Sequence, residues 1–198
     1  MKARENPFRR ERIEALAYRA PDFDWAELEA RLTRLGGQGA LVGPKGHGKT
    51  TLLEQWAARV PGSLHFRIAE GQRFLTPAQR QALCESRAAF VLVDSAEQLG
   101  WLGWRELRRR VGNARRLAIT THRPGRLPTL RHCQTSPQLL GELAAELTGV
   151  PRDCTALWRR HRGDLRRALR ELYDAGHCKK PLPAPRSVAS LNAAPIPI

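Results

Sequence analysis

The sequence predicts an α/β fold in which a parallel sheet flanked by helices is followed by a small helical lid. Up to residue 136, short apolar segments alternate with amphipathic ones, as in a doubly wound sheet, and one strand runs into a helix through a glycine-rich loop. From Pro137 onward only helical patterns occur. We therefore expect four parts: an N-terminal segment with one helix (1–36), a sheet core (37–136), a three-helix lid (137–178) and a Pro- and Ala-rich tail that we expect to be disordered (179–198).

The first predicted element is an amphipathic helix over 24–35, where Asp24 and Glu27 form a capping signal and Gly36 can end the helix. The preceding segment 11–20 is compatible with a short helix or with a strand. Apolar or alternating runs predict five strands, over 40–42, 63–68, 88–94, 115–122 and 129–135. Helices are expected over 51–60, 76–87 and 97–110 in the core and over 137–148, 152–161 and 164–175 in the lid.

Composition excludes several classes of protein. No apolar run in the 198 residues approaches the roughly 20 residues that cross a bilayer, and the first residues lack the apolar stretch of a signal peptide. The cysteines have no metal-binding spacing, so we expect reduced thiols at Cys84, Cys133, Cys154 and Cys178. These features favour a cytoplasmic protein without a membrane partner.

The net charge of +15 is concentrated in two segments. Residues 105–131 hold nine arginines and one acid, and residues 152–170 hold seven arginines and two acids. Such surfaces suit DNA or RNA, because neutralised phosphates release counterions. The alternative is a compositional bias, since 29 of the 34 basic residues are arginine.

The strongest motif is GPKGHGKT, residues 43–50, between a predicted strand and a predicted helix. In such a P-loop the backbone amides and the helix N-terminus cradle phosphates. We expect ATP or ADP to contact Gly43, Pro44, Lys45, Gly46, His47, Gly48, Lys49, Thr50 and Thr51. Lys49 would reach the β- and γ-phosphates, and the Thr50 hydroxyl would bind Mg²⁺.

A second motif should complete the magnesium site. FVLVD, residues 90–94, is an apolar strand that ends in a carboxylate, about 45 residues after the P-loop. Asp94 is therefore the second candidate for holding Mg²⁺.

With these motifs, residues 37–175 resemble the AAA+ and related ATPases of the P-loop superfamily. GPKGHGKT matches the Walker A motif, and FVLVD matches Walker B. The resemblance implies that Thr120 or Thr121, in ITTH, is the first sensor of the γ-phosphate, and that Arg166, in GDLR, is the second. The alternative for Arg166 is one more solvated arginine.

The sequence departs from this family directly after Asp94. The family usually has a glutamate there that orients the attacking water, whereas this chain has Ser95, and the next acid is Glu97. A serine cannot act as that base, and a small misplacement of Glu97 would be costly. We therefore expect slow hydrolysis, or hydrolysis only in a homo-oligomer where Arg123 or Arg126 acts on a neighbour's nucleotide.

Four aromatic residues have two possible roles. Phe8 or Tyr18 could contact adenine, or both could belong to the core. Trp101 and Trp104 could stack on exposed bases, or their helix could be buried against the sheet.

The favoured function is an ATP-binding switch or loader with weak ATPase activity that acts with nucleic acid. One alternative is a nucleotide-dependent switch that recruits a protein partner and barely hydrolyses ATP. Another is a P-loop kinase whose arginine-rich lid clamps two phosphate-bearing substrates.

Overall fold

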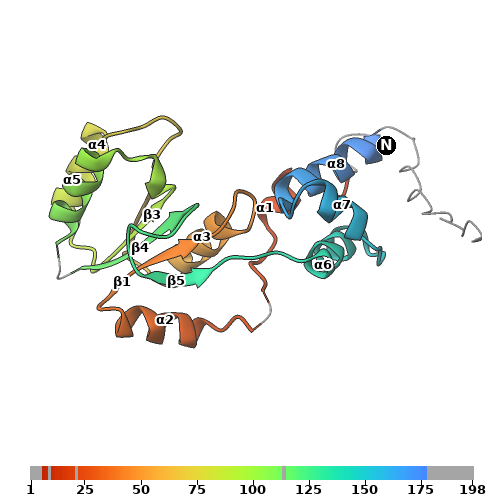
Figure 1. Ribbon diagram of the computed structural model, residues 1–198, viewed down its shortest axis with the longest axis horizontal. Coiled ribbons are helices and arrows are strands. Elements are labelled where there is room, and N and C mark those ends of the chain that lie inside the picture. The colour runs from red at the N-terminus through yellow and green to blue at the C-terminus, as the bar shows by residue number, and fades with distance from the viewer. Residues whose placement is uncertain (1–5, 9, 21, 113–114, 178–198) are drawn as a thin grey trace, which may run out of the picture.

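A five-stranded parallel sheet forms the centre of the molecule (Figure 1). The computed structural model describes residues 6–8, 10–20, 22–112 and 115–177. The strands follow the order β2-β3-β4-β1-β5, and every pairing is parallel. Their bounds are β1 Gln38–Val42, β2 Leu64–Arg67, β3 Phe90–Asp94, β4 Arg116–Thr121 and β5 Thr129–His132. The α/β fold with a parallel sheet is thus confirmed, while the tail 179–198 and Cys178 lie outside the described residues.

Helices cover both faces of the sheet, because alternate residues of its central strands point to opposite sides. Helices α2 (Trp25–Arg34) and α3 (Lys49–Arg59) pack on one face, in a cluster that includes Trp56, Leu92 and Ala118. Helices α4 (Pro77–Glu85) and α5 (Trp101–Val111) pack on the other face, with Leu107, Val93 and Ile119. All five residues of β3 are buried, as the continuous apolar run predicts.

The helix predicted over 97–110 is wrong in its first turn. A short 3₁₀ turn, Ala96–Gln98, follows β3, and α5 begins only at Trp101. The break arises because Gly100 is extended, with φ −66° and ψ 173°, and caps the new helix instead of continuing the turn. For segment 11–20 the sequence allows a short helix or a strand. The structure has a short helix, α1 (Arg10–Glu14), and residues 15–20 form no strand.

The three remaining helices form a separate group beside the sheet (Figure 1). They are α6 (Pro137–Thr148), α7 (Thr155–Arg160) and α8 (Leu165–His177), and they share a hydrophobic cluster of their own. Phe8 and Leu16 belong to that cluster, so these two residues pack on the group α6–α8, which we call the lid, whereas α2 packs on the sheet. None of the helices in the described part of the chain is long and apolar enough to span a membrane.

Candidate nucleotide-binding site

The P-loop connects the buried strand β1 to helix α3. Gly46 and Gly48 have φ values of +78° and +77°, a backbone conformation that L side chains rarely adopt, and Gly48 caps α3. Gly43 is required for a different reason, because a Cβ at this position would lie 2.4 Å from the carbonyl oxygen of Cys133. The sequence thus bends the backbone tightly at the helix N-terminus, where amides point outward.

Lys49 folds back over its own loop. Its Nζ donates to the carbonyl oxygens of Gly43, at 2.7 Å, and of Pro44, at 2.8 Å, and the residue is buried. Burial lowers the pKa of this ammonium, and the nearby Cys133, Glu97, Asp94 and Asp164 oppose the shift. Lys45, by contrast, is exposed. The structure therefore holds one of the two loop lysines inside the cradle.

Asp94 is the centre of a buried hydrogen-bond network at the end of β3. The Thr50 hydroxyl lies 3.2 Å from both carboxylate oxygens. The Thr120 hydroxyl donates to Oδ1 at 2.6 Å and accepts from the Ser95 amide at 2.7 Å. Arg67, largely exposed, approaches Oδ2 at 3.4 Å. The two predicted magnesium-binding side chains, Thr50 and Asp94, are thus in direct contact.

Thr120 and Thr121, the two candidates for the first sensor, point in different directions. β4 pairs with β3 so that Val93 is opposite Ile119, which brings Thr120 beside Asp94. The Thr121 hydroxyl donates instead to the carbonyl oxygen of Arg123, at 2.9 Å. Of these two threonines, only Thr120 therefore belongs to the Asp94 network.

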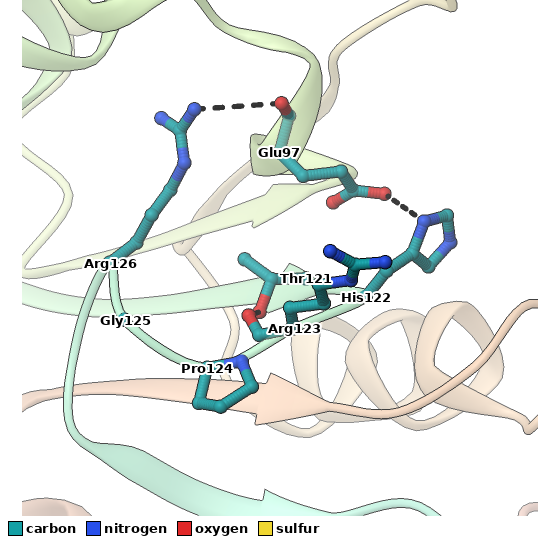
Figure 2. A pocket seen from close by; sticks show the side chains of 7 residues that line it. All are labelled: Glu97, Thr121, His122, Arg123, Pro124, Gly125 and Arg126. Atoms are coloured by element: carbon teal, nitrogen blue, oxygen red, sulfur yellow. Dashed lines mark hydrogen bonds and ion pairs between the residues drawn. The ribbon is translucent and has the colours of Figure 1, made fainter.

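Glu97 lies at the next position along this edge of the sheet, in the 3₁₀ turn after β3. One of its carboxylate oxygens is 3.3 Å from His122 Nδ1. Figure 2 shows the two side chains pointing toward each other. Residues 121–126 and Glu97 line a hollow of about 380 Å³. Arg126 donates to the backbone carbonyls of Glu97 and Leu99, and burial lowers its pKa. Arg126 is therefore used within its own chain, whereas Arg123 is exposed.

The lid contacts the P-loop directly. The Leu165 amide, at the start of α8, donates to the Gly46 carbonyl at 3.2 Å. A Cβ at position 46 would lie 2.0 Å from Asp164 Oδ1. His47 is buried against Gly163, and burial followed by the charge of Lys49 lowers the pKa of its imidazole.

Arg166, the candidate second sensor, follows directly after this contact. Its side chain is exposed. Thr51, the last predicted phosphate contact, is half-buried in the first turn of α3. The structure thus brings residues 163–165 of the motif to the P-loop, while the Arg166 guanidinium is exposed to solvent.

Of the two candidate adenine contacts, only Tyr18 is near the P-loop. Its ring would lie 3.1 Å from a Cβ at Gly48, and burial raises the pKa of its hydroxyl to about 12. Phe8 is buried in the lid cluster instead.

Comparison with known proteins finds likeness in structure alone. No protein-family model matches the sequence, and no curated protein is significantly similar to it. The Thermotoga maritima RuvB Holliday junction branch migration motor matches with a TM-score of 0.53 at 20% identity, over 77% of this chain and 60% of RuvB. A mutant of the same protein matches with a TM-score of 0.50 at 18% identity, over 78% of this chain and 62% of that one. The chain thus spans less than two thirds of these neighbours, and it shares the fold of the RuvB branch migration motor.

Proposed function

We propose that the chain binds ATP with Mg²⁺ and acts as a nucleotide switch with weak ATPase activity. The observation that carries this proposal is the cluster of Lys49, Thr50 and Asp94, where a buried ammonium lies beside a hydroxyl and a carboxylate that touch each other. Buried charges without a structural partner of opposite charge are costly, so a buried lysine that bonds only loop carbonyls is suited to a ligand.

Phosphate binding would replace the internal contacts of the loop. The carbonyls of Gly43 and Pro44 hold Lys49 in the absence of phosphate oxygens, which are stronger acceptors for an ammonium. The backbone of 43–51 would hold the phosphates. Thr50 and Asp94 offer the oxygen ligands that Mg²⁺ prefers, and the bound ion would neutralise charge on the β- and γ-phosphates.

Hydrolysis would depend on Glu97 in the absence of a glutamate after Asp94. Glu97 would orient the attacking water, Thr120 would position Asp94 and sense the γ-phosphate, and Arg166 would approach from the lid. The Ser95 backbone has φ +59°, and the next residues form the 3₁₀ turn that carries Glu97 away from β3. We expect turnover below about 1 s⁻¹ for the isolated chain.

The proposed partner is nucleic acid. Support comes from the arginine-rich segments 105–131 and 152–170 and from the fold shared with a Holliday junction motor. A homo-oligomer formed on ATP binding would allow Arg123, which is exposed, to act on a neighbour's nucleotide.

The experiment compares Lys49→Ala with Lys45→Ala, which removes the same charge from the exposed side of the same loop. Binding of a fluorescent ATP analogue, with and without Mg²⁺, should be lost in Lys49→Ala and retained in Lys45→Ala, because residue 45 would contact the phosphates through its backbone and its side chain is exposed. Turnover should rise when DNA or RNA is added to the wild type. Equal binding by the two variants, or no binding by the wild type, would refute the nucleotide site.

Ser95 favours a second candidate, a nucleotide-dependent switch that recruits a protein and barely hydrolyses ATP. In that case ATP would bind without turnover, even with nucleic acid present. Binding to the partner would then be insensitive to salt, unlike contact with a polyanion.

A further inference from the structure

An exposed apolar patch lies on the first turn of α5. Helix α5 is on the side of the sheet away from the lid (Figure 1). Among the described residues, four large hydrophobic side chains are more than half exposed, and three of them belong to this region. They are Phe74, Trp101 and Leu102, with exposed fractions of 52%, 68% and 57%, and the fourth, Val150, is in the lid region. Exposed aromatic residues that gather in one place indicate a binding surface.

The backbone holds the two parts of this patch together. The Gly100 amide donates to the carbonyl of Arg73 at 2.9 Å, and a Cβ on Gly103 would lie 2.3 Å from the same oxygen. Gly103 is inside α5, where glycine costs about 1 kcal/mol relative to alanine. The close approach explains that glycine and fixes Phe74 beside the first turn of α5.

Arginines extend the patch along the helix. Trp101, Arg105 and Arg109 are four residues apart, so they follow one face of α5. The Arg105 guanidinium lies over the Trp101 ring, 5.5 Å from its centroid, and Arg109 is exposed. This surface therefore combines flat rings with cations.

No acid of α5 balances these two arginines. Glu106, the single acid of the helix, bonds Arg80 at 2.9 Å and Arg110 at 3.0 Å. Because Glu106 already pairs with two other arginines, it does not neutralise Arg105 or Arg109. The exposed face thus keeps a positive charge that suits a polyanion.

We propose that this patch, Phe74, Trp101, Leu102, Arg105 and Arg109, binds single-stranded nucleic acid. Unpaired bases stack on exposed aromatic rings irrespective of sequence, and phosphates of the same strand reach neighbouring arginines. A duplex hides its base faces and leaves the rings without a partner. The proposal rests on the proposed partnership with nucleic acid and assigns the contact to α5 rather than to the lid arginines.

The first test measures fluorescence anisotropy of a labelled oligothymidylate of about 16 nucleotides. Trp101→Ala and Phe74→Ala should each weaken binding by about 5- to 150-fold, the range that one lost base stack produces. Val150→Ala removes an equally exposed apolar side chain from the lid region, so this control should bind like the wild type. Circular dichroism and thermal unfolding show that the variants are folded.

The second test compares two double variants with the same change in charge. Arg105→Ala with Arg109→Ala should reduce the slope of log affinity against log salt by about 1.4, for two phosphate contacts to a single strand. Arg159→Ala with Arg170→Ala, from exposed positions of the lid helices, should reduce the slope and the affinity less than the α5 variant does.

Several results would overturn the proposal. These are no binding of oligothymidylate by the wild type at low salt, equal binding of a duplex, or a greater loss in the lid variant than in the α5 variant. If Trp101→Ala binds oligothymidylate normally but loses a protein partner, the patch is a protein interface and the proposal is wrong. Because the titrations contain no nucleotide, failure of ATP binding would leave their result standing, so the two proposals fail separately.

Discussion

Replacement of Gly46 by alanine tests whether the lid rests on the P-loop. Gly46 has φ +78°, and a Cβ there would lie 2.0 Å from Asp164 Oδ1 and 2.3 Å from Asp164 Cγ. Real contacts of this kind are never so short, so either the lid or the loop must move. Gly62 offers a matched control, because its φ is also +78° and a Cβ there would meet nothing within 4 Å.

Both substitutions place an alanine at positive φ, and only Gly46→Ala also disturbs a contact with the lid. An alanine in the left-handed region costs about 1–2 kcal/mol at either position. At Gly46, displacement of the lid also breaks the bond from the Leu165 amide to the Gly46 carbonyl, which costs about 1 kcal/mol more. We therefore expect a loss of about 1–2 kcal/mol for Gly62→Ala and about 2–3 kcal/mol for Gly46→Ala.

The assay is thermal and urea unfolding of both variants and of Asp164→Ala, alone and combined with Gly46→Ala. Each kcal/mol should lower Tm by about 2–4 °C for a chain of this size. Asp164→Ala alone loses the carboxylate that accepts from the Arg167 amide at 3.0 Å, which costs about 1 kcal/mol. In the double variant the nearest remaining Asp164 atom among those close to the new Cβ is Cα, at 3.0 Å, so the combined cost should be smaller than the sum.

Equal destabilisation by Gly46→Ala and Gly62→Ala would refute the contact. So would strict additivity of Gly46→Ala and Asp164→Ala, because residues that do not touch are expected to add. Either result would mean that the lid lies away from the P-loop in solution.

Three further predictions concern Thr120, His47 and Phe8. Thr120→Val leaves the Ser95 amide unpaired and should cost about 2 kcal/mol in urea unfolding, while Thr121→Val costs clearly less; similar losses would contradict the Asp94 network. Burial lowers the pKa of His47 below its ordinary value of about 6.5, so the unfolded chain binds more protons than the folded chain as the pH falls through 6.5. The free energy of unfolding should therefore decline below that pH, and His47→Gln should flatten the decline. Parallel curves of unfolding free energy against pH for the wild type and the variant would exclude His47 as the cause. Phe8→Ala should cost about 3 kcal/mol and speed hydrogen exchange in α6 and α8; unchanged exchange would detach residue 8 from the lid cluster.

The sheet could be predicted from sequence because its strands are short, apolar and separated by clear stops. Phe90–Asp94 is buried on both faces, so every residue in it is apolar except the last. The bend of loop 43–48 could be predicted because it requires glycines at fixed positions in the sequence, two of which, Gly46 and Gly48, have positive φ. Both signals are local, and neither depends on distant parts of the chain.

Features that depend on distant contacts could not be predicted. The choice between Thr120 and Thr121 requires the register of β4 against β3, which places Val93 opposite Ile119. The break before Trp101 depends on Gly100 bonding to Arg73, a residue of an earlier loop. The packing of Phe8 on the lid joins segments more than a hundred residues apart, and no periodicity records it.

The arginines of 105–131 show why net charge alone overstates a nucleic-acid surface. Arg115 donates to the carbonyls of Leu83 and Ser86, at 3.0 and 2.7 Å, and Arg116 pairs with Glu29. Others hold the fold in similar ways: Arg108 with Gln38, Arg110 with Glu106, Arg126 with two carbonyls, and Arg131 over the ring of Phe23.

A guanidinium is suited to such structural work, because its five donors bond two acceptors in a fixed plane and lysine cannot replace it there. Arginines held in this way keep their charge, but these contacts fix their guanidinium groups on the protein. Arg105, Arg109 and Arg123 remain, and the first two lie on the same face of α5 as the exposed Trp101. A nucleic acid would therefore meet a few cations next to stacking rings, and the salt dependence of its binding should reflect two or three phosphates rather than nine.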